Sequence, residues 1–111
     1  SKRKMSIHML YRALKDFSIY SLSKSGLKML TKSLAIEFGP HVRVNGVSPG
    51  SILWPEVKEY ENEHKAIIDS TALKRQGESQ DISSACLYLI KDANYVTGQV
   101  INVDGGRNLN F

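Results

Sequence analysis

Residues 42–51 read VRVNGVSPGS, a stretch that predicts a strand followed directly by a turn. Apolar and polar residues alternate over residues 42–47, and valine is enriched there, as is typical of a strand. The dipeptide Pro49-Gly50 then marks a turn over residues 48–51. Upstream, Gly39-Pro40 ends a preceding helix, because glycine suits the position after a helix and proline cannot continue one.

That preceding helix is predicted over residues 19–38. Its apolar residues recur at helical spacing and form a stripe that consists of Ile19, Leu22, Leu27, Leu30, Leu34 and Phe38. Near its start, Tyr20 and Lys24 lie four residues apart and therefore share one face. A lysine cation close to a phenol favours the phenolate and lowers the pKa of the tyrosine. Such a phenol can donate a proton to a C=O or C=N bond near neutral pH.

Two further helices and a second strand are predicted beyond the turn. Residues 56–69 have a weak helical pattern in which charges dominate, and a clearer helix begins with Ser79 as N-cap and runs to about Lys91. The second strand is Val100–Val103, and it is closed by the turn residues 104–106. Helices that alternate with valine-rich strands indicate an α/β fold with parallel strand pairing.

Two strands are too few for a stable parallel sheet, which needs cover on both faces. The first sixteen residues show no complete strand pattern. The sequence therefore leaves two alternatives: the chain pairs with another chain, or it is the end portion of a larger domain.

The composition is that of one small globular domain. The chain has 111 residues, of which 41% are hydrophobic and 23% are charged, which excludes a disordered polymer. No apolar run approaches the ~20 residues that span a bilayer, and the basic residues 1–5 lack the apolar core of a secretory signal. Cys86 is the only cysteine, so we expect a small hydrophobic residue rather than a disulfide, and a cytoplasmic location.

The net charge of +4 is spread along the chain, and only Lys2-Arg3-Lys4 forms a run of cations. This distribution predicts a solvated surface rather than a phosphate-binding patch, and hence no nucleic-acid and no membrane partner. A small basic binding module remains an alternative, and it would show steep salt dependence of nucleic-acid binding.

Four segments follow one another in a familiar order: Tyr20-x-x-x-Lys24, residues 43–50 (RVNGVSPG), residues 96–99 (VTGQ) and residues 103–106 (VDGG). Together they resemble the C-terminal part of a short-chain dehydrogenase/reductase, from about residue 6 onward. The resemblance implies the C-terminal portion of a Rossmann-like, doubly wound parallel sheet that is incomplete in this chain. Residues 1–111 would then form a partial domain.

Within this family the chain is most similar to pteridine reductases of bacteria and trypanosomatids. The similarity lies in residues 7–15, 50–56 and 71–77. It implies a reductase that uses NADPH, with NADH not excluded, and a pterin or folate substrate. It also implies a homo-oligomer and no metal site.

The resemblance assigns roles to individual residues. Tyr20 would be the general acid, and Lys24 would lower its pKa and bind the ribose hydroxyls of the nicotinamide nucleotide. The Pro49-Gly50 turn would lie against the nicotinamide, because proline fixes the path of the chain and glycine lets backbone approach a flat ring. Backbone groups near Ser51 and Ile52 would bind the carboxamide.

Other residues keep two interpretations. Trp54 either stacks on a pterin or is an ordinary core or interface residue. Asn45 is expected to hold backbone beneath the site by hydrogen bonds. Ser6 is the nearest candidate for a catalytic position upstream of the tyrosine, where the family has serine and pteridine reductases have aspartate. Thr97-Gly98 and residues 104–106 are expected to shape turns and a subunit contact.

The glycine-rich turn that binds a dinucleotide pyrophosphate has no counterpart in these residues, and neither does the family's active-site asparagine. A second hypothesis is therefore a truncated, catalytically inactive remnant with weak cofactor binding. With part of the sheet absent, the stripe formed by Leu27, Leu30 and Leu34 would leave apolar surface uncovered. We expect self-association as a result.

Overall fold

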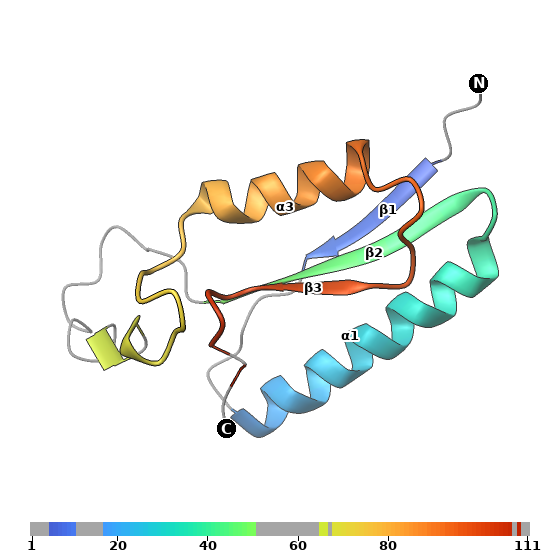
Figure 1. Ribbon diagram of the computed structural model, residues 1–111. Coiled ribbons are helices and arrows are strands. Elements are labelled where there is room, and N and C mark those ends of the chain that lie inside the picture. Colours follow the sequence, from blue (N-terminus) through green and yellow to red (C-terminus); the bar gives the residue numbers. More distant parts are fainter. Residues whose placement is uncertain (1–4, 11–16, 51–64, 67, 108, 110–111) are drawn as a thin grey trace.

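The computed structural model has three layers, with a parallel sheet between two helices (Figure 1). It describes residues 5–10, 17–50, 65–66, 68–107 and 109. In chain order the elements are β1 (Met5–Leu10), α1 (Phe17–Phe38), β2 (Val42–Pro49), α3 (Ser79–Lys91) and β3 (Val100–Val103). Helices α1 and α3 lie on opposite faces of the sheet (Figure 1).

The sheet has the order β1-β2-β3, and both neighbouring pairs are parallel. Strand β2 lies in the middle, where Val42 is paired with Met5 of β1 and Pro49 with Val103 of β3. Every residue of β2 after Val42 is buried, because helices cover both faces of the sheet. The α/β fold predicted from the sequence is confirmed.

The core lies between α3 and the sheet. Val47, Leu89 and Ala93 form its buried centre. Partly buried side chains surround that centre: Ile82, Ala85, Cys86, Val96, Ile101 and Val103. Cys86 therefore packs as a small hydrophobic residue against the core, as the sequence predicts.

Helix α1 turns part of the predicted stripe toward the sheet, since Leu27 and Leu34 are partly buried. Thr31 and Ala35 are buried, whereas Leu30 is 50% exposed. The Thr31 hydroxyl donates to the Leu27 carbonyl at 2.7 Å, so its polar group is satisfied inside the helix. Gly98 lies close to Ala35, because a Cβ built on Gly98 would be 3.4 Å from the Ala35 Cβ. Met29 and Ile36 are exposed on the outer side of α1. The self-association expected from uncovered apolar surface stays a prediction.

The sequence misses one strand and misplaces the ends of two other elements. The first sixteen residues do contain a strand, β1, which forms by parallel pairing with β2 although its sequence MSIHML lacks a strand-like pattern. Strand β2 continues through Ser48 and Pro49, which the sequence assigned to a turn, because both are paired with β3. The N-cap of α3 is Glu78 rather than Ser79, and the Glu78 N–H donates to Asp81 Oδ2 at 2.8 Å.

Of the weak helix predicted over residues 56–69, residues 65–66 and 68–69 are helical, and the rest lies outside the described residues. Among the described residues no helix is long and apolar enough to cross a membrane.

Candidate active site

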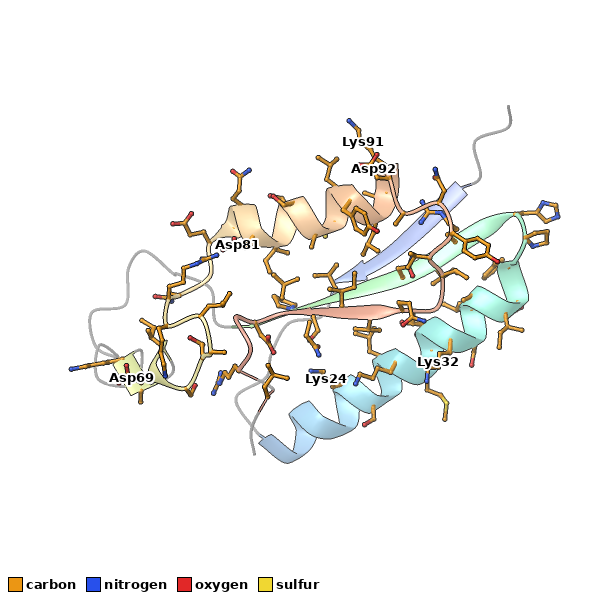
Figure 2. All side chains as sticks on the ribbon, in the orientation of Figure 1. Lys24, Lys32, Asp69, Asp81, Lys91 and Asp92 are labelled. Carbon is orange, nitrogen blue, oxygen red and sulfur yellow. The ribbon has the colours of Figure 1, made fainter. Side chains whose placement is uncertain are left out.

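Tyr20 and Lys24 both lie in α1, one helical turn apart, as predicted. Lys24 is partly buried and has an interaction partner. It precedes the buried Thr31 by seven residues, and this spacing returns to the same face of a helix. Lys24 therefore lies on the side of α1 that faces the sheet, and Figure 2 shows it in that position.

The level of Lys24 along the sheet follows from the path of the chain. Helix α1 runs antiparallel to β2, since it ends at Phe38 and β2 begins at Val42. At 1.5 Å per residue, Lys24 lies ~21 Å from the end of α1. A strand covers that distance in about six residues. Lys24 is therefore beside the carboxyl end of β2, where Pro49 and Gly50 lie.

Gly50 brings two chain segments together at this end of the sheet. Its N–H donates to the Val103 carbonyl at 2.8 Å. A Cβ at Gly50 would lie only 2.7 Å from the Asp104 Cα and 2.8 Å from its Cβ, so no larger residue fits without a shift of backbone. Glycine at this position thus allows β2 and the turn after β3 to approach each other. A contact with a nicotinamide ring stays a prediction.

Residues 104–106 form the turn that the sequence predicts. The Gly106 N–H donates to Asp104 Oδ1 at 2.9 Å. Gly105 and Gly106 have φ values of 63° and 86°, which glycine adopts without strain. The Leu73 N–H donates to the Gly105 carbonyl at 3.0 Å, and this bond fixes the segment before α3 against the turn.

Asn45 holds backbone beneath the site, as predicted. It is fully buried, its Nδ2 donates to the Val96 carbonyl at 3.0 Å, and its Oδ1 accepts from the Gln99 N–H at 3.2 Å. Thr97 Oγ1 accepts from the Val44 N–H at 3.1 Å, which extends the same attachment. The loop that leads into β3 is therefore joined to β2 by one side chain from the strand, Asn45, and by one from the loop, Thr97.

Arg43 is a structural residue that sequence reasoning missed. It is 8% exposed. Its guanidinium donates from Nη1 to the Ala93 carbonyl at 2.8 Å and from Nη2 to the Ile90 carbonyl at 3.2 Å. A longer contact joins Nη1 to the Val96 carbonyl at 3.4 Å. This cation lies at the carboxyl end of α3, where the helix dipole is negative. The alternation of apolar and polar residues in β2 suggests that one face of the strand is exposed to solvent. The sequence pattern therefore could not reveal that Arg43 is buried.

Arg75 and Asp81 join the start of α3 to the preceding segment. Arg75 Nη1 lies 3.0 Å from Asp81 Oδ2, and Nη2 lies 3.2 Å from Oδ1, so the pair is bidentate. The Arg75 hydrogen bond, followed by the Glu78 N–H, lowers the pKa of Asp81 from 3.8 to about 2. The hydrogen bond to Asp81 likewise raises the pKa of Arg75.

The structure does not bring Ser6 to Lys24. Ser6 is paired with Arg43 at the amino end of the sheet, whereas Tyr20 lies near the opposite end. The two positions differ by roughly 20 Å along the sheet. This separation argues against the predicted catalytic role of Ser6, because proton transfer needs hydrogen-bond contact. Ser51, Ile52 and Trp54 lie outside the described residues.

Known proteins are similar to this chain in sequence and in fold. A family model described as Enoyl-(Acyl carrier protein) reductase matches residues 4–108. A "Tropinone reductase homolog" from Datura stramonium is 39% identical over 101 residues, which cover 84% of this chain and 38% of that protein. The crystal structure of a short-chain dehydrogenase/reductase, described as glucose/ribitol dehydrogenase, from Brucella melitensis is 32% identical, with a TM-score of 0.77. The match covers 92% of this chain and 44% of the Brucella melitensis chain.

This chain belongs to the short-chain dehydrogenase/reductase family. The family resemblance and the Rossmann-like fold predicted from the sequence are thereby confirmed. A third relative is 4-hydroxyisoleucine dehydrogenase, solved in complex with NADH and succinate. It is 33% identical with a TM-score of 0.75, and the match covers 93% of this chain and 46% of that one. The chain spans less than half the length of each of these three proteins.

Proposed function

We propose that this chain contributes the proton-donating part of a nicotinamide-dependent oxidoreductase site that acts on a carbonyl or imine group. One observation supports the proposal: Tyr20 and Lys24 lie one turn apart in α1, and the position of Lys24 along this helix corresponds to the carboxyl end of β2, where Pro49 and Gly50 follow one another. Ligands of open α/β sheets bind outside this end of the strands.

The residues at this edge fit a nicotinamide nucleotide in their chemistry. Lys24 offers ammonium donors for ribose hydroxyls. Pro49 ends the buried strand β2. The Gly50 N–H that follows donates to the Val103 carbonyl, and this hydrogen bond holds the backbone of Gly50 in place. We propose that backbone near Ser51 and Ile52 binds the carboxamide. The bound cofactor would supply the hydride.

Tyr20 then holds the proton that the substrate oxygen or nitrogen receives. Lys24 favours the phenolate form through its charge and so lowers the pKa of the phenol. Because Tyr20 and Lys24 lie one turn apart in one helix, part of the entropic cost of bringing donor and substrate together would be removed. Tyr20 is thus the proposed catalytic residue, and Lys24 its partner.

Substrate and cofactor preference are proposed from the sequence resemblance. We propose a pterin or folate substrate, with Trp54 stacked on the pterin, and NADPH as the cofactor. The relatives named above are not pteridine reductases, and one of them binds NADH. NADH and other carbonyl substrates therefore stay as alternatives. A homo-oligomer in the cytoplasm completes the proposal.

The test compares two tyrosine variants in the presence of cofactor and dihydrobiopterin, with cofactor absorbance as the readout. Tyr20→Phe removes the proton donor and should abolish turnover. Tyr88→Phe makes the same change on α3, where Tyr88 is 51% exposed, and should leave turnover unchanged. Equal activity in the wild type and Tyr20→Phe would refute the assignment.

A further inference from the structure

Strand β3 lies at one edge of the sheet, next to β2 (Figure 1). The carbonyls of Gln99 and Val103 accept hydrogen bonds from β2 and the residue after it, both at 2.8 Å, so they point toward β2. Backbone direction alternates along a strand, so Val100 and Asn102 direct their N–H and C=O groups away from β2. Among the described residues no strand pairs with this outer edge.

The face of β3 on the α1 side of the sheet is also uncovered. Ile101 and Val103 pack against the core beneath α3. Val100 and Asn102 alternate with them and therefore lie on the other face. Asn102 is exposed, whereas every residue of β2 after Val42 is buried. Helix α1 thus covers β2 and leaves part of β3 open.

Two lysines of α1 lie on the side of this helix that faces β3. Ala35 marks that side, since a Cβ built on Gly98, just before β3, would lie 3.4 Å from the Ala35 Cβ. Lys28 and Lys32 lie within ~60° of Ala35 around the helix axis. Both are exposed, and neither forms an ion pair with a carboxylate of the described residues. Their charges are therefore available to a partner.

The lysines are level with the first half of β3. Helix α1 runs antiparallel to β3, because it runs antiparallel to β2 and the two strands are parallel. Lys28 lies ~15 Å before the end of α1, which corresponds to about four or five residues of β2. That level is Gly46, the partner of Val100. Lys28 and Lys32 are ~6 Å apart along α1, and neighbouring side chains on one face of a strand are ~7 Å apart.

We propose that the outer edge of β3 binds an extended acidic segment of another protein, which joins the sheet as a strand beside β3. Its backbone pairs with Val100 and Asn102, and two alternate carboxylates contact Lys28 and Lys32. A second copy of β3 does not supply these carboxylates, since its sequence is VINV. Nucleic acid would neutralise the lysines, but it lacks the regular N–H and C=O groups that pair with a strand edge.

The test uses the peptide acetyl-VEVEVT-amide and nuclear magnetic resonance of the ¹⁵N-labelled protein. The peptide should shift the backbone N–H signals of Val100 and Asn102 in a saturable manner and slow their hydrogen exchange. The peptide acetyl-VQVQVT-amide should bind more weakly, because it lacks the carboxylates. A fully N-methylated form of the acidic peptide should not bind, because it keeps the charges but cannot donate along a strand edge.

Matched variants locate the charge contacts. Lys28→Gln and Lys32→Gln should each weaken peptide binding about 1.5- to fivefold, the range for one exposed ion pair. Lys91→Gln removes an exposed lysine on α3, on the opposite face of the sheet, and should have no effect. Tyr20→Phe should also leave the affinity unchanged, so a failure of the proposed catalysis would not affect this test.

Four results would overturn the proposal. The first is the absence of a saturable shift at Val100 and Asn102, and the second is equal affinity for the glutamate and glutamine peptides. The third is protection of these two amides in the free protein that rises with protein concentration, which would place a second copy at this edge. The fourth is equal protection of the same amides by oligothymidylate, which would favour nucleic acid.

Discussion

Replacement of Arg43 tests how the central strand and α3 are held together. Arg43→Met keeps the length of the apolar stem but removes the guanidinium. The carbonyls of Ile90 and Ala93 then lose their donors at 3.2 and 2.8 Å. Both bonds are charge-assisted, and such bonds contribute ~1.5–3 kcal/mol each.

The burial of the cation itself offsets part of this value, because Arg43 is 8% exposed and its guanidinium donates to backbone carbonyls rather than to a carboxylate within the described part of the chain. We therefore take the lower bound for each bond and expect a loss of about 3 kcal/mol in the free energy of unfolding. Arg43→Lys keeps the charge but cannot reach both carbonyls in a fork, so about half of that loss is expected.

The assay is urea unfolding followed by far-UV circular dichroism. Arg107→Met is the control, since it removes an exposed guanidinium, and it should change stability by less than about 0.5 kcal/mol. Hydrogen exchange should locate the weakening at the carboxyl end of α3. An Arg43→Met protein as stable as the wild type, or one no less stable than Arg43→Lys, would refute the reasoning.

Two other predictions follow from particular contacts. Gly50→Ala should destabilise the fold by about 1–3 kcal/mol, since its Cβ would lie 2.7 Å from the Asp104 Cα. Gly26→Ala, in α1 with nothing within 4 Å, should instead stabilise by about 0.5–1 kcal/mol. Thermal unfolding of both variants measures these changes in stability, and a Gly50→Ala protein as stable as the wild type would contradict the predicted clash. The lowered pKa of Asp81 adds stability above its unfolded value of 3.8, and this contribution should be lost as the pH falls through about 2. Asp81→Asn should abolish this acid-dependent loss, and an unchanged pH profile would count against the ion pair.

Local signals predicted some elements well because they depend on the chain nearby. Strand β3 has its predicted bounds, since VINV is followed at once by the turn residues 104–106. The end of α1 at Phe38 follows from Gly39-Pro40. The Tyr20–Lys24 spacing could also be read directly, because both residues lie on one helix.

Other features depend on tertiary contacts that a single sequence does not display. Strand β1 forms because β2 offers a paired edge, although its own residues give no strand signal. Arg43 looks like a residue on the solvent side of a strand, yet it is buried and bonded to the segment around Val96. Leu30 fits the apolar stripe of α1 but is half exposed, because the smaller Thr31 and Ala35 face the sheet.

The most direct test of the central claim is the titration of the Tyr20 phenol, observed with ¹³C-labelled tyrosine and assigned by its loss in Tyr20→Phe. The pairing with Lys24 predicts a pKa below the ordinary value of ~10 for tyrosine. It also predicts that Lys24→Met raises this pKa, whereas Lys28→Met, at an exposed position one turn further along α1, does not. A Tyr20 pKa that is ordinary and insensitive to Lys24→Met would contradict the assignment of this pair as acid and partner.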